Sequence, residues 1–433
     1  VNMLDVTKEL LKNTYGFRQE TLDLYEKALK DVENQFKKFD EIREYNQMKV
    51  LKAFQDENIS DMHFTNSTGY GYDDIGRDTL DKVYARIFNA EAGLVRPHFV
   101  NGTHAIGSAI FGNLRPGEKF CAISGKPYDT LHGIIGLDEN KRIGSLREYG
   151  IGYSQVDLTE DDKFDFVKIK EALKDETIKM VHIQRSPGYA YRKAFLVREI
   201  EEVIKYVKSL RDDVIVFVDN CYGEFIDVIE PTDVGADLIA GSLIKNIGGG
   251  IAPCGGYIVG KKEYVEQASY RLTIPGIGGE CGATFGLMRT MFQGLFLAPH
   301  IAVEALKGAL FCARIMELAG FEVLPKSTDE RSDIIQTIKF GNAENVINFC
   351  KGIQYGSPID SHVECEPWDM PGYKDKVIMA AGAFIQGSSI ELSADAPIRP
   401  PYIAYIQGGL TFDHAKIGIL IALNNILKNN ITK

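Results

Sequence analysis

The chain has 433 residues, 45% of them hydrophobic and 25% charged, which is the composition of an ordinary globular protein long enough for about two domains. Its formal net charge of −11 disfavours nucleic acid and anionic membrane surfaces as partners, because both select clustered positive charge. The seven cysteines, an odd number without a C-x-x-C pair, argue against a disulfide framework and a zinc ribbon and favour the reducing cytoplasm.

Residues 1–60 predict an N-terminal helical segment. Their start is mixed and charged, unlike a secretory signal. From about Glu20 the apolar residues recur at three- and four-residue steps, as an amphipathic helix requires: Leu22, Tyr25, Leu29, Val32, Phe36 and Phe39. We expect this apolar face to dock either on the body of the protein or on a neighbouring subunit.

Residues 61–295 predict a large α/β domain. After a polar loop at 59–76 and a short helix at Asp78–Asn89, strand-like and helical stretches alternate, which predicts a mostly parallel central sheet with helices on both faces. The predicted strands are Leu94–Val100, Lys119–Ser124, Tyr153–Val156, Lys179–Ile183, Val214–Val218 and Asp237–Ile244. The predicted helices are Thr103–Phe111, Thr130–Leu137, Phe166–Leu173 and Val197–Leu210.

Residues 296–433 predict a smaller C-terminal α+β domain. The apolar stretch Gly294–Met316 is interrupted by charged residues and by His300, so it predicts a core helix rather than a membrane span. Beyond it we expect strands at Phe321–Leu324 and Asp333–Phe340, a helix at Glu344–Tyr355 and a final helix at Asp413–Lys428.

An acid and a lysine end two successive apolar strands of the large domain, at Asp219 and Lys245. The carboxyl ends of strands in an α/β sheet are where ligands bind. A buried carboxylate can pair with a pyridinium nitrogen and a lysine can form a Schiff base, so the two residues predict a site for pyridoxal 5′-phosphate. The alternatives are a helix cap or structural ion pair for Asp219 and a surface position for Lys245.

The residues around Lys245 lead to two further predictions, one about the pKa of Lys245 and one about the glycines that follow it. Burial near other cationic groups should depress its pKa, since the amine must lose its proton to form an imine. The glycines at 248, 249, 250, 255 and 256 should let the backbone pass close to a ligand.

The segment Asn101–His104 follows a predicted strand and opens a predicted helix. Backbone N–H groups at a helix N-terminus bind anions, so Gly102, Thr103 and His104 form a candidate phosphate cup. The hydroxyl of Ser242, three residues before Lys245, could reach the same phosphate. The alternatives are a plain turn with Thr103 as the helix cap, and a structural hydroxyl at Ser242.

Tyr128 is a candidate contact for the cofactor ring, and Arg399 is a candidate contact for the carboxylate of an amino-acid substrate. Tyr128 follows the next predicted strand and could stack on a planar ring, although most tyrosines serve only in packing. Arg399 lies between prolines that stiffen its backbone, and a guanidinium suits bidentate binding of a carboxylate. An interface or structural arginine is the alternative.

These positions occur in the chain order of fold-type I pyridoxal-phosphate enzymes, and five segments make the resemblance specific: GYDDIGRDTLDKVYARIF, VRPHFVNGTHAI, VDNCYGEF, SLIKNIGGGIAPCGGYIVG and FIQGSSIELSADAPIRPPYIAYIQGGLT. Over essentially its whole length the chain resembles the Cys/Met-metabolism enzymes, and most closely the methionine γ-lyase-like, cystathionine β-lyase-like or aluminium-resistance family.

The resemblance implies a role for each matching residue. Lys245 would bind the cofactor covalently and carry protons, Asp219 would pair with the pyridine nitrogen, and Tyr128 would stack on the ring. Gly102, Thr103 and Ser242 would bind the phosphate, and Arg399 the substrate α-carboxylate. In related enzymes a tyrosine and an arginine of an adjacent subunit complete the phosphate site, which suggests Tyr72 and Arg77 here, with Tyr70 equally well placed.

The chain departs from the family pattern at two points. The usual Ser-x-Thr-Lys becomes Ser242-Leu-Ile-Lys245, with one hydroxyl fewer, and Thr103-His104 replaces a Met-Gly type sequence. Cofactor binding should survive both changes, whereas substrate specificity cannot be carried over.

We therefore expect a cytoplasmic lyase that acts on a sulfur-containing amino acid as a homodimer or homotetramer, with no metal, nucleic acid or membrane partner. Transamination or aldol cleavage of a β-hydroxy amino acid is the enzymatic alternative. A non-catalytic role in metal tolerance is the alternative of another class, for which the sequence offers only diffuse carboxylates.

Overall fold

The structure, a computed structural model, describes residues 3–137, 142–369 and 375–429. The chain divides into two compact units, one of residues 44–299 and one that joins residues 1–43 to 300–433. Two long helices, α2 (Gln19–Asp56) and α9 (Met288–Leu318), each contribute to both units. This division differs from the predicted boundaries, because most of the N-terminal helical segment shares a core with the C-terminal residues.

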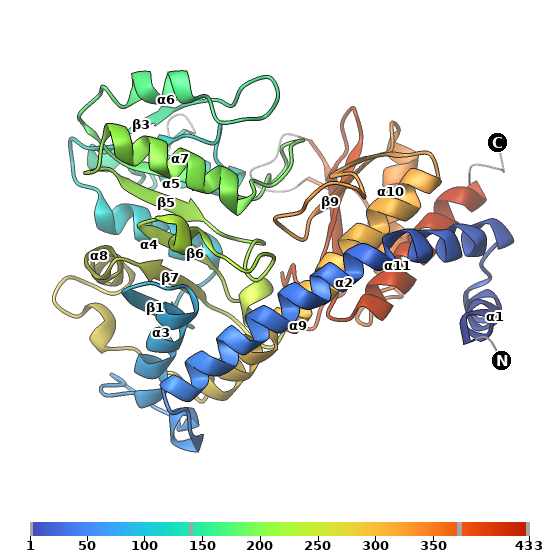
Figure 1. Ribbon diagram of the computed structural model, residues 1–433, viewed down its shortest axis with the longest axis horizontal. Coiled ribbons are helices and arrows are strands. Elements are labelled where there is room, and N and C mark those ends of the chain that lie inside the picture. Colours follow the sequence, from blue (N-terminus) through green and yellow to red (C-terminus); the bar gives the residue numbers. More distant parts are fainter. Residues whose placement is uncertain (1–2, 138–141, 370–374, 430–433) are drawn as a thin grey trace. The chain divides into compact units, whose positions relative to one another are not determined.

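The unit of residues 44–299 is built on seven strands of the described chain in the order β1-β7-β6-β5-β4-β2-β3 (Figure 1). The strands are β1 (Ala92–Arg96), β2 (Lys119–Ala122), β3 (Gly152–Gln155), β4 (Ile178–Gln184), β5 (Ile215–Asp219), β6 (Leu238–Ser242) and β7 (Gly256–Gly260). β7 is antiparallel to its neighbours β1 and β6, while β3, β2, β4, β5 and β6 pair in parallel. The mostly parallel sheet that the sequence predicted is confirmed.

Helices alternate with these strands. They are α3 (Ile75–Ile87), α4 (Gly102–Asn113), α5 (Asp129–Ile135), α6 (Phe166–Ala172), α7 (Val197–Leu210) and α8 (Lys262–Leu272). Every residue of β5, β6 and β7 is buried, as expected for strands covered on both faces. α4 and α8 pack together closely enough that a Cβ on Gly112 would lie 2.6 Å from the carbonyl oxygen of Gln267.

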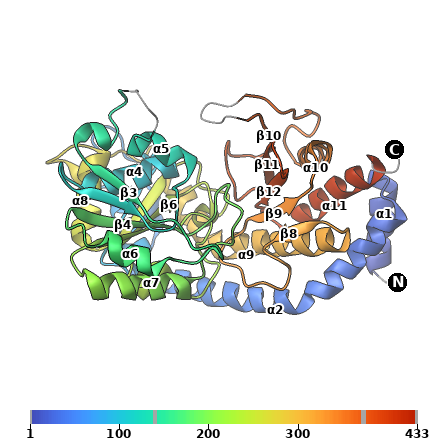
Figure 2. The same ribbon diagram turned by 90° about the horizontal axis from the view of Figure 1, so that it is seen from above.

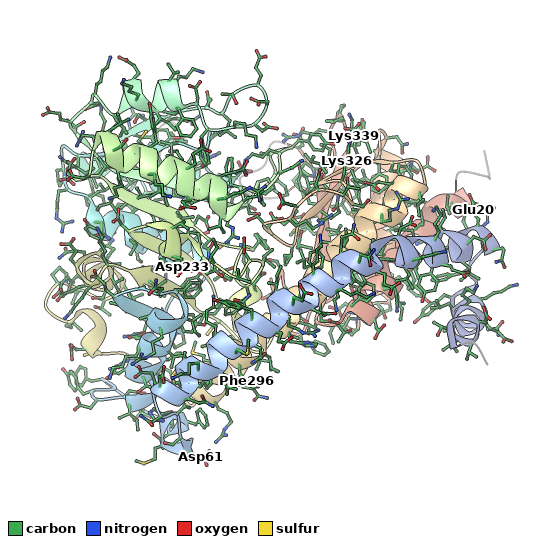
Figure 3. The ribbon with its side chains drawn as sticks, viewed as in Figure 1. Glu20, Asp61, Asp233, Phe296, Lys326 and Lys339 are labelled. Carbon is green, nitrogen blue, oxygen red and sulfur yellow. The ribbon has the colours of Figure 1, made fainter. Side chains whose placement is uncertain are left out.

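The long helices contribute aromatic residues to this unit. Phe54 of α2 packs edge-on against Phe292 and Phe296 of α9, with ring centroids 5.7 and 6.1 Å apart. Phe296 is labelled in Figure 3, as is Asp61, the first residue of the short 3-10 helix η1 (Asp61–Phe64). These contacts hold the two helix ends to each other within the unit of residues 44–299.

The second unit contains five described strands in a fully antiparallel sheet of order β10-β11-β12-β9-β8. They are β8 (Glu322–Leu324), β9 (Gln336–Lys339), β10 (Val377–Ala380), β11 (Ser393–Pro397) and β12 (Ile403–Gln407). Its helices are α1 (Met3–Tyr15), α10 (Ala343–Tyr355) and α11 (Phe412–Asn429), with parts of α2 and α9. This is the predicted smaller α+β arrangement.

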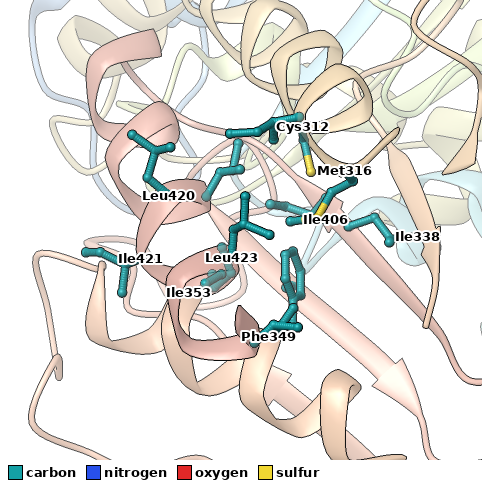
Figure 4. Close-up of a cluster of buried hydrophobic side chains, with 14 of the residues drawn as sticks. Cys312, Met316, Ile338, Phe349, Ile353, Ile406, Leu420, Ile421 and Leu423 are labelled. Atoms are coloured by element: carbon teal, nitrogen blue, oxygen red, sulfur yellow. The ribbon is translucent and has the colours of Figure 1, made fainter. Parts of the chain in front are cut away.

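The core of this unit explains the apolar stripe of the N-terminal helix. Leu22 and Tyr25 are buried in a cluster with side chains of α9, α10, α11 and the antiparallel sheet, several of which are labelled in Figure 4. Figure 2 shows α10 and α11 side by side. The stripe therefore packs within its own chain.

Helix α9 is long and apolar enough to cross a membrane by composition, but 67% of its most apolar window is buried in the protein. We conclude that α9 is a core helix, as the sequence predicted.

Candidate active site

The carboxyl ends of parallel strands bring two predicted residues, Asp219 and Ser242, to one edge of the large sheet. β4 ends at Gln184, β5 at Asp219 and β6 at Ser242, and Asp219 pairs in register with Gln184 and with Ala240. Asp219 is 8% exposed, and its Oδ1 accepts the backbone N–H of Cys221 at 3.1 Å. No lysine or arginine of the described chain forms an ion pair with it, so this buried carboxylate can accept a cationic group.

Lys245 lies three residues beyond β6 and is partly buried. Its Nζ lies 3.8 Å from the centroid of the Tyr222 ring, a distance typical of a cation–π contact. Tyr222 itself has a left-handed φ of 71°, which is strained for a tyrosine. We did not predict Tyr222 from the sequence, because left-handed backbone at a non-glycine residue leaves no pattern in one sequence.

The electrostatic environment of Lys245 is acidic. Burial lowers the pKa of Lys245, but four neighbouring groups outweigh burial and raise the pKa above its ordinary value: Cys221, Tyr222, Asp219 and Glu224. The prediction of a depressed pKa is therefore wrong for the protein by itself. It assumed cationic neighbours, whereas acidic groups surround the amine.

The glycines after Lys245 serve backbone packing. A Cβ on Gly248 would lie 1.6 Å from the carbonyl oxygen of Leu243, and one on Gly249, whose φ is 59°, would lie 2.2 Å from that of Gly294. A Cβ on Gly255 would lie 2.6 Å from the carbonyl oxygen of Arg96. At these three positions the missing side chain admits neighbouring backbone, and the close approach of a ligand to the glycines at 248, 249, 250, 255 and 256 stays a prediction.

The predicted phosphate cup does open a helix. α4 begins at Gly102, and the side chain of Asn101 caps it by accepting the N–H of His104 at 2.9 Å, so Asn101 rather than Thr103 is the cap. A Cβ on Gly102 would lie 3.0 Å from the Cβ of Ser242. The glycine thus lets the helix N-terminus meet the end of β6.

The other polar side chains of the cup have partners within the chain. Thr103 Oγ1 lies 3.0 Å from Thr130 Oγ1, and Ser242 Oγ accepts the N–H of Ile244 at 3.3 Å. His104 Nδ1 accepts the N–H of Val100 at 3.1 Å, and burial lowers the pKa of His104. A neutral His104 ring held by its own loop contributes no positive charge to an anion.

Tyr128 lies next to the end of β4. Its backbone N–H donates to Gln184 Oε1 at 2.7 Å, and its ring is 6.0 Å from that of Tyr189. A Cβ on Gly188 would lie 2.7 Å from the Tyr128 ring, so the absence of a side chain at this glycine leaves room for the ring.

The tyrosines and the arginine assigned to a neighbouring subunit differ in exposure. Tyr70 and Tyr72 are stacked with centroids 5.4 Å apart and are 74% and 63% exposed. Arg77 is 1% exposed and donates to Asp78 Oδ1 and to the carbonyl oxygens of Gly71, Glu280 and Gly282. Arg77 therefore organises the loop that presents the tyrosines, and its contact with another subunit stays a prediction.

Arg399 belongs to the other unit, in the turn after β11. Its side chain is 56% exposed, and its guanidinium pairs with Asp375 Oδ2 at 3.0 Å. It is held by a carboxylate as well as by the proline-rich backbone that the sequence indicated.

A layer of buried polar residues next to the site was not predicted. Arg185 is fully buried and its Nη1 donates to Asn220 Oδ1 at 2.8 Å, while Asn220 Nδ2 donates to Glu230 Oε2 at 3.0 Å. Glu224 accepts from Tyr257 Oη at 2.8 Å, and burial raises the pKa of Glu224 to about 8. The sequence signal was present, since VDNCYGEF is a polar run directly after an apolar strand, but only its first acid was interpreted.

No group of three or more His, Cys, Asp or Glu side chains in the part of the chain that the structure describes is arranged to hold a metal ion. The paired acids Asp73-Asp74 and Asp161-Asp162 thus belong to no such group. The site consists of a carboxylate, an amine, a helix N-terminus and aromatic rings.

Comparison with known proteins places the chain in a family. The chain matches the methionine gamma-lyase family over residues 21–427. A carbon–sulfur lyase involved in aluminium resistance from Clostridium novyi is 66% identical, with a TM-score of 0.94 over 97% of this chain and 99% of that chain. A proposed cystathionine beta-lyase involved in aluminium resistance from Clostridium acetobutylicum is 64% identical, with a TM-score of 0.93 over 97% of this chain and 98% of that chain.

More distant relatives agree with this placement. L-Methionine gamma-lyase of Treponema denticola is 26% identical over 254 residues, 58% of this chain and 56% of that protein. A pyridoxal-5′-phosphate dependent protein from Escherichia coli, 16% identical, has a TM-score of 0.58 over 91% of this chain and 97% of that chain, which indicates a shared fold. The predicted fold class, fold-type I, and the predicted family resemblance are both confirmed.

Proposed function

The chain belongs to the methionine gamma-lyase family, and we propose that it uses pyridoxal 5′-phosphate to cleave a carbon–sulfur bond of a sulfur-containing amino acid. The observation that carries this proposal is the presence, at one edge of the parallel sheet, of the buried carboxylate Asp219 and the partly buried amine Lys245. The family supports the lyase class, and the choice of substrate is part of the proposal.

The residues present fit the cofactor in charge and shape. Asp219 is a buried carboxylate to which no arginine or lysine of the described chain is paired, which suits a protonated ring nitrogen. The missing Cβ of Gly102 brings the N-terminus of α4 against Ser242, and a helix N-terminus with an adjacent hydroxyl suits a phosphate. Tyr128 supplies an aromatic face.

In the reaction we propose, the residues of the site bind the cofactor and move protons. The bound cofactor supplies an electron sink for the substrate Cα. Lys245 Nζ holds the cofactor covalently at rest and accepts the Cα proton, and Asp219 keeps a proton on the ring nitrogen. The Tyr128 hydroxyl donates a proton to the departing sulfur.

We propose further that Arg399 binds the substrate α-carboxylate, for which the substrate must compete with Asp375. A second copy of the chain would contribute Tyr72 or Tyr70, and Arg77 through the loop it orders, so that the smallest competent unit is a homodimer that could extend to a homotetramer. The substrate class, a free amino acid, fits an enzyme of the cytoplasm.

Two measurements test this function. The purified protein should show a visible absorbance band that borohydride abolishes and that Lys245→Ala lacks. Incubation with cystathionine, methionine, cysteine or homocysteine should release a keto acid and ammonia, together with a thiol from the first two or hydrogen sulfide from the last two. A Lys245→Ala variant that keeps both band and lyase activity would contradict the assignment, and stoichiometric amino transfer or aldehyde release would replace the lyase by the alternative reactions.

A further inference from the structure

Glu224 is a buried acid close to Lys245 that the proposed reaction does not use. Its side chain is 0% exposed, and it lies in the turn that joins β5 to β6. Two residues of this turn, Tyr222 and Phe225, have left-handed φ values of 71° and 62°. Backbone strain therefore flanks Glu224, and strain of this kind collects at functional sites.

The surroundings of the Glu224 carboxyl group favour its neutral form. Oε1 accepts from Tyr257 Oη at 2.8 Å, whereas Oε2 is buried without a hydrogen-bond partner among the described residues. A Cβ on Gly241 of β6 would lie 2.6 Å from Oε1, so the glycine makes room for the carboxyl group. A carboxylate with one donor and no cation in contact is costly to bury.

The turn that carries Glu224 is fastened to the loop that carries Lys245. Asn246 Nδ2 donates to the carbonyl oxygens of Tyr222 and Glu224 at 2.9 and 3.1 Å. Lys245 Nζ in turn lies 3.8 Å from the centroid of the Tyr222 ring, two residues before Glu224 in the same turn. The amine and the carboxyl group therefore share one buried neighbourhood without a direct ion pair, and their charges interact there.

Titratable groups face Glu224 from each element packed around it: Tyr84 of α3, Tyr257 of β7, Lys245 after β6, and Cys221 and Glu230 of its own turn. Burial raises the pKa of Tyr84, of Tyr257 and of Cys221, so these groups stay neutral near pH 8. Glu230 lies 3.5 Å from the Arg185 guanidinium. Lys245 is therefore the group around Glu224 whose charge changes during the proposed reaction.

We propose that Glu224 is a positioning residue that sets the proton balance at Lys245. It takes up a proton when Lys245 loses its positive charge and releases that proton when the charge returns. One proton moves between water and a carboxyl oxygen, and no other bond changes. This inference rests on the proposed function, in which Lys245 must alternate between charged and neutral forms.

The test follows the reactivity of Lys245 in the full chain freed of cofactor. Acetic anhydride acylates only neutral amines, so mass spectrometry of the Lys245 peptide across a pH series reports the pH of half-maximal reaction, with the exposed Lys126 in the same digest as reference. Glu224→Gln removes a negative charge that holds the lysine proton and should lower this pH by about one unit. Glu224→Asp keeps the charge and should stay close to wild type.

Three results would overturn the proposal: an unchanged Lys245 profile in Glu224→Gln, the same shift in Glu224→Asp, or an equal shift at Lys126. Should Glu224→Gln fail to fold by circular dichroism, Tyr257→Phe replaces it. Loss of that hydroxyl favours neutral Glu224 and should raise Lys245 reactivity near pH 8 at least about twofold, and no change would reject the coupling. The assay needs no cofactor, so its result does not depend on whether the proposed function is correct. Failure of the proposed function would instead appear as a wild-type protein without the borohydride-sensitive band.

Discussion

Arg77 is a fully buried cation whose partners are mostly backbone oxygens. It connects Gly71 to Glu280 and Gly282, and so ties the loop of Tyr70 and Tyr72 to a segment about two hundred residues away in the chain. A buried guanidinium of this kind stabilises because each carbonyl oxygen it serves would otherwise be left unsatisfied.

We predict that Arg77→Ala lowers the free energy of unfolding by about 3 kcal/mol, since it leaves buried carbonyl oxygens without donors. Urea denaturation checks this value. Arg86→Ala is the matched control on the same helix, because Arg86 is half exposed and pairs with Glu57 at the surface, so its loss should be much smaller. Equal losses in the two variants would show that the backbone contacts of Arg77 contribute little.

His182 of β4 predicts a pH dependence. It is fully buried between the rings of Phe120 and Phe217, and neither ring nitrogen has a hydrogen-bond partner among the described residues. Burial lowers the pKa of His182 from 6.5 to about 4, and the charge of Asp219 offsets part of this effect. The folded-state pKa is depressed, so the stability tied to the neutral ring is fully present above pH 6.5 and is lost as the pH falls toward 4.

We therefore predict that wild type loses about 3 kcal/mol relative to His182→Phe between pH 6.5 and 4. Urea denaturation of both proteins at a series of pH values measures the difference. Glu224 titrates in both proteins, and its raised pKa acts with the opposite sign, so only the difference isolates His182. A difference that does not change with pH would show that His182 is charged or solvated in the fold.

At the scale of elements, the close packing of helices α10 and α11 requires a glycine at position 352, where there is no room for a side chain. A Cβ on Gly352 would lie 2.4 Å from the Cα of Ala422. Gly352→Ala gains helix propensity, but it must push two backbones apart, and we expect a net loss of about 2 kcal/mol.

The control for this prediction is Gly133→Ala in α5, where the nearest atom to the new Cβ, Ile143 Cδ1, is 3.6 Å away. That change should be neutral or stabilise by up to about 1 kcal/mol. Thermal unfolding of the two variants compares them. If Gly352→Ala were as stable as Gly133→Ala, the close approach of α10 and α11 would not be required by the fold.

The periodicity of apolar residues predicted the positions of those helices and strands that have one apolar face. The stripe of Leu22, Tyr25 and Val32 is buried as predicted, and the predicted strand 214–218 matches β5 to within one residue. β7 was missed because its sequence, GYIVG, is short and bounded by glycines, and because an antiparallel strand inside a parallel sheet depends on tertiary pairing. The same limit hid the reason for the glycine at 249, whose close contact is with the backbone of Gly294.

The chemistry of single residues was predictable where a polar side chain interrupts an apolar run, as at Asp219 and Lys245. It was not predictable where the effect depends on neighbours in space. The raised pKa of Lys245 arises from Cys221, Tyr222 and Glu224 as well as from Asp219. The hydrogen bonds of Arg77 reach carbonyl oxygens of residues 280 and 282. A single sequence does not reveal such neighbourhoods.

At the scale of the whole molecule, the chain forms two compact units that share two long helices. The predicted division at 60 and 295 followed the change in local pattern. The structure divides the chain by packing, and residues 1–43 belong with the C-terminal half because Tyr25 and Phe36 pack against Phe311 and Phe412.

The proposed sharing of a site between two copies predicts complementation. Tyr70 and Tyr72 are exposed and stacked in a loop that Arg77 orders, so replacing both by Ala should leave the fold intact and impair the site of a partner copy. Lys245→Ala impairs the site of its own copy. Unfolding the two variants together and refolding them should produce mixed dimers that contain one intact site, with about a quarter of wild-type sites restored in a random mixture.

Each variant refolded alone is the control and should stay inactive, and size-exclusion chromatography should show that both assemble like wild type. Activity that returns only in the mixture follows from the geometry of a shared site, because no single chain then carries both Lys245 and the two tyrosines. Failure to recover activity in a mixture that does form dimers would mean that each chain completes its own site. The exposed pair Tyr70 and Tyr72 would then need another role.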